Sequence, residues 1–381
     1  MLYAGPARNE NEVECAVVLA GQVFDQTTGN VSSSVERKHF QVREHPGAGK
    51  DSVIVVSLDG KGVIGTTFLI DRIFPRGQAS IRGTFLSSFC VDPSLRAQGY
   101  SRVLMAAALQ ACSTRSTAIA LVIARRAVDR FYTKFGFWGL SQYSKLTVEA
   151  AALAEISVAG FRLRRASPAD IPQCNDKYAF AYKDSFGHCV RDRQTWEYIL
   201  KKCGYLCVPV SVIEKEAVII GYAVHDESGN IHEIGCDNTP DARTALAVLA
   251  RSAAAKLLTV HIPPIHPAVR ALEGFDVTLA TRECPFGGHM VKVVDPVQLV
   301  DAAVCRIEQL ARSKNTPPGT EDADGVCLAW NGEKAYVSLH SHMDSVASVA
   351  RLLGVARVSS AGRPLTFDPP VSFNIPLVDQ I

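Results

Sequence analysis

The stretch DPSLRAQGYS (Asp92–Ser101) joins an apolar, strand-like segment to an Ala/Leu-rich, helix-like one. The first N–H groups of a helix lack partners within the helix and carry partial positive charge, so a helix start can hold a phosphate. Gly99 permits close backbone approach, and the small Ser101 keeps the next position open. Arg96 and Arg102 add charge that would suit a polyphosphate. The stretch predicts a phosphate site, although an Arg-x-x-Gly-x-Ser run also matches many ordinary loop-to-helix junctions.

A second candidate is the aromatic stretch RFYTKFGF (Arg130–Phe137). A tyrosine hydroxyl can act as a general acid, which makes Tyr132 a candidate for proton transfer. An aromatic helix face more commonly packs into a core, and Tyr132 could be a packing residue with a satisfied hydroxyl. The stretch taken alone leaves both readings open.

The elements around these two stretches follow a definite order. Residues 84–91 read as a strand, 102–112 as a helix, 117–124 as a buried strand and 127–137 as a short helix ending at Gly136. This order, with Val91-Asp92-Pro93 leading into the loop, resembles the GCN5-related N-acetyltransferase (GNAT) superfamily. The resemblance covers residues ~10–150.

The GNAT resemblance implies that the loop binds the pyrophosphate of acetyl-CoA and that the aromatic stretch lies beside the thioester sulfur. Tyr132 would then protonate the departing thiolate. A splayed strand around Phe89 would present backbone groups to the pantetheine arm and the thioester oxygen. The residues expected to bind acetyl-CoA are Phe89, Cys90, Val91, Arg96, Ala97, Gln98, Gly99, Tyr100, Ser101, Arg102, Ala127 and Val128.

The base that takes the proton of the amine is less evident. Many GNAT enzymes carry a glutamate on the fourth strand, whereas this chain has TFLSSFC there, without a carboxylate. Resemblance to the Eis (enhanced intracellular survival) family implies that the C-terminal carboxylate, here on Ile381, acts as the base, with Asp379 as a nearby substitute. The plain alternative is a disordered tail, but PPVSFNIPLV is apolar and β-rich.

The segments before the loop predict a helix over residues 12–25 and a polar loop to about Lys50. Two β-branched runs around Asp59-Gly60 predict a hairpin. Residues 160–290 repeat the order of elements seen in the first half. The matching strand-to-helix junction, IGCDNTPDART, has Asp237 and Asp241 where a phosphate loop would lie. We expect this half to be a degenerate repeat that does not bind CoA.

The element order predicts an α/β chain with mixed sheets: a catalytic GNAT domain (1–150), a second GNAT-like domain (151–290) and a small C-terminal α/β domain (291–381). Arg191 and Trp196 match an Arg-x-x-x-x-Trp element of the Eis family. The segment MVKVVDPVQLV resembles the entry to that family's sterol-carrier-protein-like domain. In the last domain, two runs around Asn331-Gly332 predict a hairpin, flanked by helices.

Composition bounds the class of protein. The chain has 381 residues, a formal net charge of +2 and eleven cysteines embedded in apolar runs. The small charge provides no strong field for nucleic acid or an anionic membrane, and the cysteines suit reduced core thiols. Neither a signal peptide nor a membrane span is expected, so cytoplasmic location is the default. A homo-oligomer is compatible with these numbers.

Two pairs of residues have the spacing of metal ligands. Cys203 and Cys207 form one pair, and His340 and His342 form the other. Neither pair has the further ligands that a metal site needs, so no metal is expected.

The GNAT resemblance implies an acetyl-CoA-dependent N-acetyltransferase, and we expect it to act on a primary amine of a small or medium molecule. The Eis-type resemblance implies an aminoglycoside or a lysine-type amine, and an amino sugar is equally compatible. The alternative is a non-catalytic acyl-CoA-binding or scaffold protein.

Overall fold

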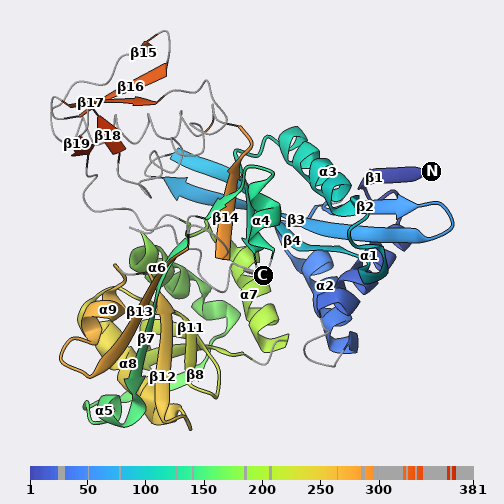
Figure 1. Ribbon diagram of the computed structural model, residues 1–381. Coiled ribbons are helices and arrows are strands. Elements are labelled where there is room, and N and C mark those ends of the chain that lie inside the picture. Colours follow the sequence, from blue (N-terminus) through green and yellow to red (C-terminus); the bar gives the residue numbers. More distant parts are fainter. Residues whose placement is uncertain are drawn as a thin grey trace. The chain divides into compact units, whose positions relative to one another are not determined.

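The computed structural model describes residues 1–24, 31–49, 51–76, 79–124, 128–139, 141–183, 187–205, 208–263, 265–284, 288–295, 298 and a few short strands beyond residue 320. The chain divides into two compact units. In the described residues each unit is built around a seven-stranded mixed sheet with helices packed on it, which confirms the predicted α/β class (Figure 1).

The first sheet has the strand order β1-β2-β3-β4-β5-β14-β6. Its strands are β1 (Leu2–Pro6), β2 (Val53–Leu58), β3 (Gly62–Arg76), β4 (Ala79–Val91), β5 (Ile119–Ala124), β6 (Trp138–Gly139) and β14 (Gly288–Val293). The pair β4–β5 is parallel, whereas the other neighbours are antiparallel. The predicted hairpin joins β2 and β3, where Gly60 and Gly62 adopt positive φ of 76° and 74°.

Helices cover both faces of this sheet. They are α1 (Glu10–Phe24), α2 (Val31–Glu44), α3 (Tyr100–Thr114) and α4 (Asp129–Thr133), with a 3₁₀ turn η1 at Pro93–Leu95. Figure 1 shows α3 on one face and α1 and α2 on the other. On its inner side α3 buries Leu104, Met105 and Ala108 against strand residues such as Ile54 and Val122.

The expectation of a loop up to about Lys50 was wrong, because α2 occupies most of that segment. Its sequence, VSSSVERKHFQVRE, lacks the apolar stripe that marks a helix packed on a sheet. The positions of α2 that turn inward are polar instead: Ser34 and Gln41 are buried.

The second sheet has the order β13-β7-β12-β11-β10-β9-β8, and its β11–β12 pair is parallel. Its strands are β7 (Ser141–Glu149), β8 (Phe161–Arg165), β9 (Val210–Lys215), β10 (Val218–His225), β11 (Asn230–Cys236), β12 (Leu257–Ile262) and β13 (Val277–Cys284). Its helices are α5 (Ala150–Ala154), α6 (Ile171–Tyr182), α7 (Arg193–Tyr205), α8 (Thr239–Ser252) and α9 (Pro267–Ala271), with a 3₁₀ turn η2 at Pro168–Asp170.

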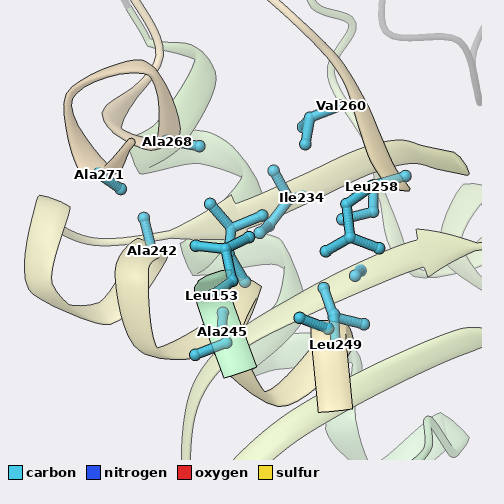
Figure 2. Close-up of a cluster of buried hydrophobic side chains, with 14 of the residues drawn as sticks. Leu153, Ile234, Ala242, Ala245, Leu249, Leu258, Val260, Ala268 and Ala271 are labelled. Carbon is cyan, nitrogen blue, oxygen red and sulfur yellow. The ribbon is translucent and has the colours of Figure 1, made fainter. Parts of the chain in front are cut away.

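One hydrophobic core of the second unit lies between α8 and the sheet (Figure 2). Ala242, Ala245 and Leu249 of α8 meet Ile234 of β11 and Leu258 of β12. Small alanines at helical spacing let α8 lie close to the sheet, so this Ala-rich helix is also a packing surface.

Two strands do not follow the order of the chain. β7 ends the sequence of the first half but pairs with β12 and β13 in the second sheet. β14 follows the second unit but lies between β5 and β6 in the first sheet. The passage between the units therefore falls at Gly139 and Leu140, earlier than residue 150, because β7 finds its partners in the second sheet.

Beyond residue 320 the described elements are β15 (Glu321–Asp322), β16 (Gly325–Trp330), β17 (Glu333–Val337), β18 (Val358–Ser360) and β19 (Arg363–Leu365). β16 and β17 pair antiparallel from Trp330 and Glu333 outward, as the Asn-Gly turn signal predicts. The helices and the tail expected in this last part lie outside the described residues. None of the helices that the structure describes is long and apolar enough to cross a membrane.

Candidate functional site

The first sheet opens between β4 and β5. These strands pair at only three positions, and the last of them joins Phe85 and Leu121. Beyond it β4 continues to Val91 and β5 to Ala124 without further pairing to each other. On this side the second half of β4 therefore has no neighbouring strand, and its backbone faces an opening.

A bulge in β4 lies on this opening. Thr66 of β3 pairs with Cys90, and Phe68 pairs with Ser87, so Ser88 and Phe89 together oppose one residue. Ser88 has a positive φ of 55°. A β-bulge bends its strand and increases the local twist, so the bulge turns β4 away from β5.

The register after the bulge decides where the backbone of β4 points. The N–H of Asp92 donates to the Ile64 carbonyl at 2.8 Å, so Asp92 is bonded toward β3. Backbone groups of successive residues point to opposite edges of a strand. The N–H and C=O of Val91 therefore point into the opening, where a bound chain could pair with them.

The predicted phosphate loop follows directly. Asp92 accepts from the Ser94 N–H at 2.8 Å and begins η1. Ala97 and Gly99 adopt left-handed backbone angles, with φ of 63° and 87°. Gly99 is the N-cap of α3, and a Cβ placed there would meet no atom within 4 Å. The junction is thus open above the helix start.

The first N–H groups at this junction are available to a ligand. Among the described residues no acceptor is bonded to the backbone N–H of Gln98, Gly99, Tyr100 or Ser101. The earliest bond into α3 runs from the Arg102 N–H to the Gly99 carbonyl, at 2.9 Å. The side chains of Arg96, Gln98 and Arg102 are exposed around these donors. The arrangement suits an anion held by backbone amides.

Tyr132 lies in an aromatic group beside the opening. Its ring centroid is 6.0 Å from that of Phe89, 5.3 Å from that of Phe131 and 5.9 Å from that of Phe137. Tyr132 is 7% exposed, and its hydroxyl has no hydrogen-bond partner in the described part of the chain. Burial raises the pKa of Tyr132 to about 12, so the phenol holds its proton at neutral pH.

Cys90 is not suited to act as a nucleophile. Burial raises the pKa of its thiol to about 12, although the positive charge of Lys38 opposes the shift. Since the thiolate is the reactive form of cysteine, a thiol held in this state packs as a small apolar side chain.

Two of the predicted site residues cannot be compared with the structure. Ala127 and Ile381 are not among the described residues, so the role of the Ile381 carboxylate as base stays a prediction. Val128 is the N-cap of α4, in the turn that leads to Tyr132. The structure thus brings Phe89, Cys90 and Tyr132 together and places the loop at the end of the same strand.

One face of α2 carries polar residues that were not predicted to belong to a site. Ser34, Lys38, Gln41 and His45 recur at helical spacing, and we call this set the α2 stripe. Gln41 Nε2 donates to Ser87 Oγ at 3.0 Å, which brings the stripe onto β4 next to the bulge. The helical spacing of these polar residues is the one sequence pattern that could have indicated a helix with a functional face. A polar stripe is, however, more typical of a solvated helix surface.

The corresponding junction in the second unit is built differently. Asn238 is the N-cap of α8, and its side chain accepts from the Asp241 N–H at 2.8 Å. Asp237 is paired with Lys177. The helix start is therefore capped by its own chain and flanked by carboxylates, which disfavours an anion.

Metal ligands do not gather in the described residues, where no group of three or more candidate side chains lies together. The side chains of Cys203, Cys207, His340 and His342 lie outside the described part.

Comparison with known proteins agrees with this geometry. Residues 54–144 match the family model described as an acetyltransferase (GNAT) domain. The chain carries a GNAT domain. The matched span runs from β2 to β7 and so contains β4, the loop and Tyr132. No curated protein matches the sequence.

Solved structures extend the likeness beyond the GNAT domain. A GCN5-related N-acetyltransferase from Anabaena variabilis aligns with a TM-score of 0.64 and 14% identity, over 100% of this chain and 97% of its own. Eis1 from Mycobacterium abscessus aligns with a TM-score of 0.58 and 14% identity, over 98% and 95%. A GCN5-related N-acetyltransferase from Kribbella flavida aligns with a TM-score of 0.58 and 16% identity, over 80% and 73%. The predicted GNAT architecture is confirmed at the level of the fold.

Proposed function

We propose that the GNAT domain transfers an acetyl group from acetyl-CoA to a primary amine of a small or medium molecule. The observation that carries this proposal is the opening between β4 and β5 beyond Phe85 and Leu121. It lies next to both a helix start with free N–H groups and a protonated tyrosine. GNAT proteins use acyl-CoA as co-substrate, and these features would suit its pyrophosphate, its pantetheine arm and its thioester.

The backbone N–H groups from Gln98 to Ser101 would bind the pyrophosphate, with Arg96 and Arg102 adding positive charge. The backbone of Val91 would pair with the amide groups of the pantetheine arm, as a further strand pairs in a sheet. The thioester would then reach the bulge at Ser88 and Phe89, close to the Tyr132 ring.

In the reaction, the amine nitrogen attacks the thioester carbonyl carbon, so a C–N bond forms and the C–S bond breaks. The sulfur leaves with the bonding electrons and takes a proton from the Tyr132 hydroxyl. The nitrogen loses one proton to a base, for which the Ile381 carboxylate remains predicted. Holding the two substrates together lowers the barrier further, because both are oriented before reaction.

The proposal is tested by measuring release of the CoA thiol with a panel of amines that includes amino sugars, an aminoglycoside and lysine. Thiol release that depends on an amine, with the acetylated amine found by mass spectrometry, would support acetyl transfer. Tight CoA binding by calorimetry without thiol release from any amine would instead favour the acyl-CoA-binding or scaffold protein.

A further inference from the structure

The α2 stripe brings a lysine near Cys90, which follows the bulge of β4. Gln41 is bonded to Ser87, and His45 accepts from the Gly47 N–H at 2.8 Å, so these two polar side chains have partners. Lys38 lies one helical turn before Gln41 on the same face. Helix α2 therefore brings an ammonium group to the stretch of β4 that contains the bulge.

Lys38 lies against an aromatic ring. Its Nζ lies 5.4 Å from the centre of the Phe24 ring. The titratable groups that act on Lys38 are the Cys90 thiol, which is neutral at neutral pH, and the Arg37 guanidinium, and within the described residues no carboxylate pairs with it. Burial lowers the pKa of Lys38 to about 8, so the group is mostly charged at neutral pH. A partly buried charge without a counter-ion is costly, and binding an anion would offset that cost.

Lys38 lies on the face of the first sheet from which the amine substrate would approach. Val91 packs with Leu104 in the core under α3, and Tyr132 belongs to the same core. Successive side chains of a strand point to opposite faces, so Cys90 points the other way, toward α2 and Lys38. In the proposed reaction Tyr132 donates its proton to the thioester sulfur from the face of the sheet that α3 and α4 cover. The amine would then approach the thioester carbon from the opposite face, which α2 covers.

We propose that Lys38 binds a carboxylate of the acceptor, which makes the preferred substrate an amine that also bears a carboxylate, such as an amino acid. This rests on the proposed acetyl transfer and narrows its substrate class. A polycationic amine would bring its charges toward the Lys38 ammonium and be repelled. An amino acid would pair its carboxylate with Lys38 and leave its amine free to attack.

The binding arm of the test uses N-acetyl amino acids, which resemble the products and have no free α-amine. The affinities of N-acetylalanine, N-acetylphenylalanine and Nα-acetyllysine for the CoA-saturated enzyme are compared with those of their amides. A charge-assisted hydrogen bond predicts a preference for the acid of about 10- to 100-fold in at least one pair. Lys38→Met should remove this preference, and Lys38→Arg should retain it.

The matched control is Lys183→Met, since Lys183 also lies over a ring, 4.1 Å from the centre of Phe180, but in the second unit. That variant should keep the preference. Equal affinity for acids and amides, or a preference that survives Lys38→Met, overturns the proposal.

The turnover arm separates this inference from the function beneath it. Thiol release is measured with the free amino acids, their amides and an aminoglycoside. Turnover of amides and the aminoglycoside at rates equal to those of the acids would leave acetyl transfer standing and reject the role of Lys38. A carboxylate preference in binding without thiol release from any amine would reject acetyl transfer and retain the carboxylate site.

Discussion

The ring of Tyr132 meets the ring of Phe89 edge to face, with 6.0 Å between their centroids and 66° between their planes. Phe89 belongs to the bulge of β4, and Tyr132 belongs to α4. An edge-to-face pair of this kind is a favourable aromatic geometry. The contact therefore ties the helix that carries the proposed acid to the distorted part of the strand.

Tyr132→Phe should lower turnover by about 10²–10⁴-fold, the usual contribution of a general acid. The affinity for CoA should change little, because the ring and its aromatic contacts remain. Stability should also be unchanged, since no hydrogen bond to the hydroxyl is found in the described part of the chain. Steady-state kinetics, calorimetry and thermal unfolding provide the three readouts, and a variant with nearly full turnover would leave Tyr132 as a packing residue.

Gly99→Asp should abolish CoA binding while the fold stays intact. The substitution places a carboxylate in open space above the start of α3, where the pyrophosphate would lie. The matched control is Gly274→Asp, because Gly274 has a φ of 90° and equally open surroundings in the second unit. Calorimetry with CoA should show binding lost in the first variant only. Unchanged affinity in Gly99→Asp would contradict the assignment of the loop.

His266 should make stability depend on pH. Its side chain is fully buried, Nε2 lies 2.9 Å from the Ile234 carbonyl, and Nδ1 accepts from the Ala268 N–H. Burial lowers the pKa of His266 to about 4 from 6.5. Because the folded pKa is the lower one, the stability is complete above about pH 6.5 and is lost as the pH falls toward 4.

The loss should reach about 3 kcal/mol at pH 4, from 1.36 kcal/mol per pKa unit. Urea unfolding at several pH values measures it. The glutamine of His266→Gln does not titrate, so the free energy of unfolding of the variant should lack this pH dependence. The difference in that free energy between wild type and variant should therefore narrow as the pH falls. A difference that stays constant between pH 7 and 5 would contradict the prediction.

Arg191→Met should destabilise the second unit by about 3–5 kcal/mol. Arg191 forms two bonds of 2.7 Å to Glu233, and both side chains are fully buried. The Tyr222 hydroxyl also donates to Glu233, at 2.6 Å. Loss of Arg191 would leave a buried carboxylate without its counter-charge.

Arg191→Met combined with Glu233→Leu should be more stable than Arg191→Met alone, since no unpaired charge remains. Urea unfolding followed by the fluorescence of the buried Trp196 reports on this region, because the Arg191 guanidinium lies 5.0 Å from its ring. A double variant no more stable than the single one would show that the ion pair is not the source of the loss.

Local patterns in the sequence predicted much of the first unit. The hairpin at Asp59-Gly60, the strand up to Val91 and the helix after the loop are each marked by turn residues or by side-chain periodicity. Helix α2 was missed because its inward positions are Ser34, Lys38 and Gln41, where the periodicity rule looks for apolar residues.

The loop and the tyrosine of the proposed site could be named from the sequence, but the geometry around them could not. The bulge at Ser88 depends on how β3 and β4 align, and the opening depends on where β4 and β5 stop pairing. Pairing between strands is set by tertiary contacts that single-strand patterns do not encode. For the same reason the pairing of β14 with β5 could not be predicted from its own sequence.

The position of β14 has a consequence for biosynthesis. The first sheet cannot be completed until Val293 has left the ribosome, whereas the strands of the second sheet have all been made by Cys284. Domains usually mature from the N-terminus onward during translation, but here the unit begun first is the last to be closed. Until then β5 has a free edge open to mispairing, so the nascent GNAT domain would benefit from a chaperone until β14 is made.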